Sequence, residues 1–102
     1  MPTGNKTDGE KAATNATLTV APITRAIAAT TARSTLIPAG FHRIMADTDC
    51  YVLQGGVAVD ATTSSTLLLA GQREVIAVAD ALDGYVAVIR KSADGTLYIS
   101  QL

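Results

Sequence analysis

The chain contains one histidine and one cysteine, His42 and Cys50, which could in principle form a base and a nucleophile. If Asp47-Thr48-Asp49 is a three-residue hairpin loop, Ala46 faces Cys50 and His42 faces Gln54. His42 and Cys50 would then share a sheet face but lie about 13 Å apart, at about 3.3 Å per residue. A general base must lie within hydrogen-bond reach of the group that it activates. We therefore expect a buried Cys50, a half-exposed His42 and no enzymatic activity.

Three other short motifs could carry chemistry. Asp47-Thr48-Asp49 offers carboxylates, but Ca²⁺ needs about six to eight oxygen ligands and the stretch lacks the glycine and distal glutamate of an EF-hand. Aspartates in turns usually bond their own backbone. Gly55-Gly56 lacks the context of a phosphate loop, and Asp94-Gly95 indicates a hairpin turn. We expect no metal and no cofactor.

Short runs of β-branched and apolar residues from Thr17 onward predict an all-β fold. Turn-forming residues separate them at intervals of about 8–12 residues, as in a single antiparallel β-sandwich or jelly-roll-like domain. Residues 23–31 could instead form a helix, although their threonines disfavour it. The expected strands are residues 17–21, 23–29, 35–37, 41–46, 50–54, 57–59, 66–69, 74–78, 85–90 and 96–101.

A repeat accompanies these runs, because STLIPAG at residues 34–40 recurs as STLLLAG at residues 65–71. Each copy is followed by a β-like run, an acidic turn and a run that begins near Tyr-Val, at Tyr51 and at Tyr85. The pattern predicts an internal duplication that builds two similar β-units facing each other. An accidental match is the alternative in a chain rich in Ala and Thr.

The length and composition of the chain indicate its number of domains and its tendency to self-associate. The 102 residues predict one domain over residues 16–102, preceded by a polar, flexible arm over residues 1–15. Hydrophobic residues make up 48% of the chain and charged residues 17%, which is more apolar than an average soluble domain. No apolar run reaches 18 residues, so we expect no membrane span. The apolar surplus favours a homo-oligomer, a dimer or a trimer, over a compact Ala-rich monomer.

The net charge and the N-terminal residues bear on nucleic-acid binding and on the compartment in which the chain is made. The formal net charge of −1 gives no electrostatic footprint for nucleic-acid binding. The first residues lack the apolar core of a signal peptide, so we expect synthesis in a cytoplasm.

The predicted hairpin has two apolar faces, of which a sandwich buries only one. One face carries Ile44, Ala46, Cys50 and Val52, and the other carries the four interface candidates Phe41, Met45, Tyr51 and Leu53. We expect another segment or subunit to cover this second face. The alternative is a carbohydrate-binding surface, although the chain has no Trp and only four aromatic rings.

An ordered series of motifs resembles small structural proteins of tailed bacteriophages. The series IPAGFHRIMADTDCYVLQGG, TTSSTLLLAG, REVIAV, YVAVI and ADGTLYIS lies within residues 23–102. The positions that match the family pattern are Arg43, Ile44, Ala46, Asp49, Cys50, Tyr51, Val52, Gly55, Leu69, Ala70, Gly95, Thr96, Leu97 and Ile99.

The resemblance implies a β-sandwich or jelly-roll subunit of the virion. It is most similar to a cement or decoration protein that binds the major capsid protein on the outside of the head, after synthesis in the host cytoplasm. Proteins of this kind also serve elsewhere in the particle. A virion-associated module for carbohydrate binding or host attachment is the alternative that the resemblance leaves open.

Overall fold

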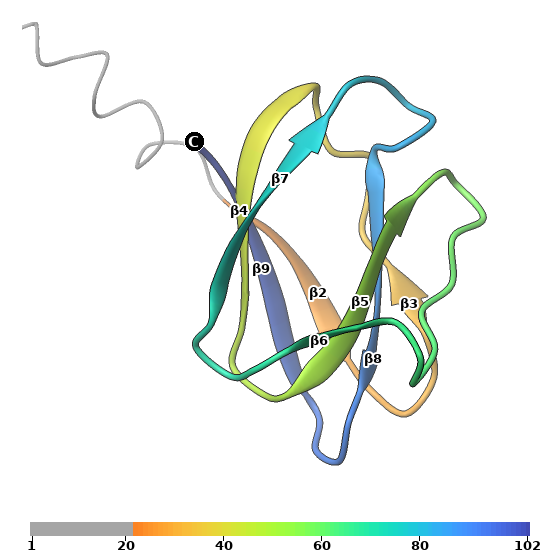
Figure 1. Cartoon of the computed structure of the whole chain (residues 1–102), viewed down its shortest axis with the longest axis vertical. Helices are drawn as coiled ribbons and strands as arrows, with labels where there is room; N and C mark the ends of the chain where they lie inside the picture. The colour runs from red at the N-terminus through yellow and green to blue at the C-terminus, as the bar shows by residue number, and fades with distance from the viewer. Residues whose placement is uncertain (1–21) are drawn as a thin grey trace, which may run out of the picture.

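The computed structural model describes residues 22–102, and within them every regular element is a β-strand (Figure 1). The arm predicted over residues 1–15 and the strand predicted over residues 17–21 lie outside the described residues. The strands form two four-stranded antiparallel sheets. One sheet has the order β2-β9-β4-β7, with bounds Ile23–Ile27, Gly95–Gln101, Gly40–Ala46 and Arg73–Val78. The other has the order β3-β8-β5-β6, with bounds Ala32–Arg33, Tyr85–Arg90, Cys50–Gly55 and Thr66–Leu68.

The inner faces of the two sheets share one hydrophobic core. Side chains alternate along β4 and β5, so that Ile44 and Val52 point inward between exposed or half-buried neighbours. Leu97 and Ile99 of β9 enter the same core and are 0% and 1% exposed. Full burial of each such side chain stabilises the fold by about 1.5–3 kcal/mol. The all-β prediction is therefore confirmed, and the arrangement is sandwich-like.

The regular runs of the sequence form strands close to the predicted bounds. Residues 41–46, 50–54, 66–69, 74–78, 85–90 and 96–101 fall largely within β4 to β9. Residues 23–27 form β2, so the helical alternative for this run is wrong. Residues 57–59 are not a strand, because β5 ends at Gly55 and the chain then turns, with the amide of Val59 donating to the carbonyl of Gly56 at 3.0 Å.

The predicted strand over residues 35–37 is also absent, because one extra residue interrupts its pairing with β8. The amide of Ser34 donates to the carbonyl of Val86 at 2.9 Å, and the amide of Val86 returns a bond to the Ser34 hydroxyl at 3.1 Å. The next bond runs from the amide of Ile37 to the carbonyl of Gly84 at 2.8 Å, one residue later than a regular ladder requires. This bulge leaves Leu36 half exposed.

The predicted hairpin between residues 41–46 and 50–54 is wrong. β4 pairs with β7 and β9, whereas β5 pairs with β6 and β8. Residues 47–49 therefore carry the chain from one sheet to the other, across a separation of about 10 Å between packed sheets. The Asp94-Gly95 turn does the same between β8 and β9. A short polar turn can join two strands as a hairpin within one sheet or as a crossover between two sheets. The residues of the turn do not distinguish these two cases.

Each of the two repeat units consists of a repeat motif and the two strands after it, β4 and β5 in the first unit and β7 and β8 in the second. The two units lie side by side, and each one spans both sheets. The strands after the two repeat motifs pair antiparallel, β4 with β7 and β5 with β8. The preceding segments also occupy matching places, because β3 pairs with β8 and β6 with β5. Gly40 and Gly71, which end the two motifs, are the glycines of the described chain with positive φ, at 128° and 78°. The units thus share a layout, but they are not separate halves that face each other.

Candidate functional site

His42 and Cys50 do not form a catalytic pair. They lie on strands of different sheets, and both side chains are buried. The expectation of a half-exposed His42 is wrong: His42 is 3% exposed, with its Nε2 atom 2.7 Å from the carbonyl oxygen of Pro38. Cys50 is buried as predicted, and desolvation, followed by the negative charges of Asp49 and Asp47, raises the pKa of its thiol to about 11. A thiol of this kind stays protonated near neutral pH and is a poor nucleophile.

The carboxylates of the acidic turn are engaged by backbone amides. Asp47 Oδ1 accepts a bond from the amide of Thr96 at 2.7 Å, and Asp49 Oδ1 accepts one from the amide of Ala70 at 2.8 Å. Both bonds reach segments far away in sequence, so they fix the crossover to its neighbours and not merely to its own turn. Among residues 22–102, no three His, Cys, Asp or Glu side chains are grouped so that they could hold a metal ion.

The Gly55-Gly56 pair has a packing role. A Cβ atom on Gly55 would lie 2.9 Å from a methyl carbon of Val59, so the side-chain-free backbone lets the loop fold back onto β5. Gly56 approaches the carbonyl of Leu82, 3.4 Å from where its own Cβ would be. The pair therefore brings two loops together and does not open toward a ligand.

The four predicted interface residues do not form one surface. Phe41 and Met45 lie on the outer face of the β2-β9-β4-β7 sheet, whereas Tyr51 and Leu53 lie on the outer face of the other sheet. Phe41 is 63% exposed and Leu53 43%, while Met45 and Tyr51 are half-buried. The alternation of buried and exposed residues was predicted correctly, but the missing hairpin separates the exposed residues onto opposite sides of the molecule.

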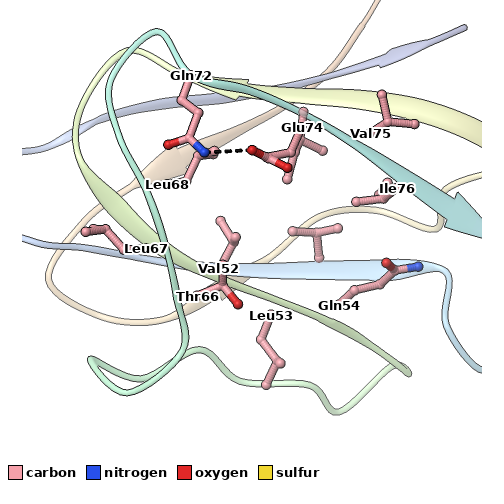
Figure 2. Close-up of a pocket in the computed structure, with 12 residues that line it drawn as sticks. Val52, Leu53, Gln54, Thr66, Leu67, Leu68, Gln72, Glu74, Val75 and Ile76 are labelled. Carbon is pink, nitrogen blue, oxygen red and sulfur yellow. Dashed lines mark hydrogen bonds between the residues drawn. The ribbon is translucent and has the colours of Figure 1, made fainter.

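A groove of about 330 Å³ opens where the edge strand β7 faces β5 and the edge strand β6 (Figure 2). Figure 2 shows Gln72 and Glu74 on one side, joined by a 2.6 Å hydrogen bond, and Thr66 and Gln54 on the other. Most of the lining is aliphatic, and no aromatic ring belongs to it. The lining residues are Ile44, Val52, Leu53, Gln54, Thr66, Leu67, Leu68, Gln72, Glu74, Val75, Ile76 and Val86.

The backbone of β7 borders this groove with groups directed away from β4. The amide of Leu102 bonds the carbonyl of Phe41, so the odd-numbered residues of β4 direct their backbone groups toward β9. The even-numbered residues of β4 then bond β7, which leaves the backbone groups of Arg73, Val75 and Ala77 on the outer edge. One of these groups has a partner, since Gln54 Nε2 donates to the carbonyl of Ala77 at 2.8 Å.

A second apolar surface lies at one end of the molecule, where three loops meet. Leu82, Val57 and Leu36 are 83%, 69% and 51% exposed, and we call them the apolar tip. The loops touch, because a Cβ on Gly84 would lie 2.7 Å from Leu36 Cδ1 and Gly56 abuts the carbonyl of Leu82. Sequence reasoning missed this surface by placing Leu36 and Val57 in strands. The sequence does carry a signal for this surface: Val57 and Leu82 are large apolar residues that stand beside turn-forming residues, Gly55-Gly56 and Asp83-Gly84.

Comparisons with protein-family models, with curated protein sequences and with solved structures found no match for this chain. Among the residues that the structure describes, no helix is long and apolar enough to span a membrane.

Proposed function

We propose that this chain is a structural protein of a tailed-bacteriophage virion, a cement protein that binds the major capsid protein on the outside of the head. The observation that carries the proposal is the apolar tip: Leu82, Val57 and Leu36 are exposed together on loops that a β-scaffold holds in place. An exposed cluster of large apolar side chains is typical of an interaction site. The order of short motifs in residues 23–102 supplies the identity of the partner.

The finer architecture that we propose is a jelly roll. Eight antiparallel strands in the orders β2-β9-β4-β7 and β3-β8-β5-β6 are what two nested Greek keys produce. Such a scaffold suits a cement protein because its loops gather at the two ends, where they can contact another surface without disturbing the core. Jelly rolls also occur in lectins, but the groove of this chain has no aromatic ring on which a sugar could stack.

The proposed mechanism is the bridging of neighbouring capsid subunits. Each bound copy adds buried area across a seam of the shell, so that the pressure of packaged DNA opens the seam less readily. A standard interface of about 1,600 Å² is sufficient for a stable contact, and many copies add avidity. Residues 1–15, which are polar and carry both signs of charge, would lie across a shell subunit.

The test is binding to expanded heads that lack the protein, with occupancy measured by cryo-electron microscopy. The double variant Val57→Asp/Leu82→Asp should lower occupancy at least tenfold, because it places charge in the apolar contact. Phe41→Asp on the outer face of β4 is the matched control and should bind normally. Normal occupancy of the tip variant would contradict the proposal. Deletion of residues 2–15 tests the arm separately, and unchanged occupancy and head stability would remove the arm from the mechanism.

A further inference from the structure

The two repeat units differ in what covers the outer edge of their first strands, β4 and β7. β4 of the first unit lies between β9 and β7. β7 of the second unit is the counterpart of β4, but within residues 22–102 it pairs only with β4. The internal symmetry of the fold therefore leaves one strand position vacant among the described residues, beside β7 and at the mouth of the groove.

β9, which pairs with the edge of β4 opposite β7, shows which side-chain pattern such a strand position requires. Residues 96–100 of β9 read TLYIS, in which Leu97 and Ile99 enter the core and Tyr98 faces outward. Residues 17–21 read TLTVA, which repeats this pattern with Leu18 in the place of Leu97 and Val20 in the place of Ile99. The groove beside β7 is lined by Ile44, Ile76, Val86 and other aliphatic side chains that two such residues would cover.

The chain cannot place residues 17–21 on its own β7. These residues are joined to Ile23, the first residue of β2, through Pro22 alone. β2 and β7 are the opposite edges of the sheet, and a strand added outside β7 would be four strand spacings, or about 19 Å, from β2. Two Cα–Cα steps from residue 21 to residue 23 span at most about 7.6 Å.

We propose that residues 17–21 of a second copy of this chain add as an antiparallel strand to the outer edge of β7. Leu18 and Val20 enter the groove, and the backbone groups of Arg73 and Val75 bond the added strand. A sheet edge that is lined by aliphatic side chains and has no strand partner among residues 22–102 is a template for such pairing. Donor and acceptor are different parts of the chain, so the contact is heterologous, and a discrete oligomer forms when such contacts close a ring or when two copies exchange these residues. The inference does not depend on where that assembly acts.

The experiment is a mass measurement of the full chain by light scattering and native mass spectrometry over a range of concentrations. The wild-type chain should be a discrete oligomer. Leu18→Asp/Val20→Asp should weaken association at least about 100-fold, because it sets two charges in an aliphatic groove. Thr19→Asp is the matched control, since Thr19 takes the outward place of Tyr98, and it should stay oligomeric.

The acceptor is tested independently by Val75→Pro, which removes an amide directed at the added strand and spares those that bond β4. Arg73→Pro, at the first residue of β7, replaces it if the first variant does not fold, as judged by circular dichroism. Either variant should be a folded monomer of 10.5 kDa. A wild-type chain that is monomeric at all concentrations overturns the proposal. An oligomer that survives either the donor change or the acceptor change in folded protein overturns it as well.

Discussion

The thiol of Cys50 lies at the start of β5, beside the acidic crossover, and its position determines its reactivity. Burial and the nearby carboxylates raise the pKa from 9.0 to about 11, so the thiolate fraction at pH 8 falls about 100-fold in the folded protein. We expect iodoacetamide at pH 8 to alkylate native protein at least about 100-fold more slowly than protein in denaturant. Mass spectrometry over time measures both rates. Equal rates would contradict the buried, protonated thiol.

The same shift affects stability at alkaline pH. The folded state keeps the Cys50 proton between pH 9 and pH 11, whereas the unfolded state loses it. The free energy of unfolding should therefore decrease as pH rises through this window. The Cys50→Ala variant lacks the titrating group, and its decline over the same window should be smaller.

The carboxylate of Asp83 fixes the turn between β7 and β8. It accepts bonds from the amides of Asp80 and Ala79, each at 3.0 Å, and these bonds lower its pKa below 3.8. A lowered pKa gives a contribution to stability that is present above pH 3.8 and is lost as pH falls through the folded-state value. The difference in unfolding free energy between wild type and Asp83→Asn should therefore shrink from pH 7 to pH 2. A difference that is constant with pH would contradict this assignment.

At the scale of elements, the two crossovers at one end of the sandwich pack directly on each other. A Cβ on Gly95 would lie 2.6 Å from Thr48 Cγ2, and Asp47 bonds the amide of the next residue, Thr96. We expect Gly95→Ala to destabilise the protein by about 1–3 kcal/mol, because the added methyl group would overlap Thr48 and the Asp47 carboxylate that holds the Thr96 amide. Gly56→Ala is the control, since its Cβ would meet a single carbonyl oxygen at 3.4 Å. Urea denaturation of both variants gives the comparison, and equal stabilities would contradict the tight contact.

The elements also show how far the sequence can predict this fold. Runs such as residues 74–78 and 85–90 were predicted correctly, because a strand depends on the residue types within it. The pairing of β4 with β5 was predicted wrongly, because pairing depends on residues far away: β9 and β7 occupy both edges of β4. The bulge at Leu36 has the same origin, since it is set by the register against β8.

At the scale of the whole molecule, the two candidate surfaces are products of strand order. The groove joins Ile44, Val52, Leu68, Ile76 and Val86, which lie on five strands of both sheets. The apolar tip joins three loops that are separate in sequence. Sequence reasoning identified apolar residues that face away from the core, such as Phe41 and Leu53, but it could not decide which of them lie together.

The two surfaces lead to a final prediction, because an oligomer presents the apolar tips of several chains at once. If the tip binds the shell and the β7 edge holds the assembly together, a monomeric variant has an intact tip but loses avidity. We expect Leu18→Asp/Val20→Asp to bind expanded heads about 10²- to 10⁴-fold more weakly than wild type. Val57→Asp/Leu82→Asp should show the opposite defect, with a normal oligomer mass and little binding.

Two outcomes would contradict this prediction. If the monomeric variant binds heads as tightly as wild type, each chain binds the shell alone. If the tip variant binds heads normally, the contact with the shell lies outside the apolar tip. Titrating both variants against heads of known copy number separates these outcomes.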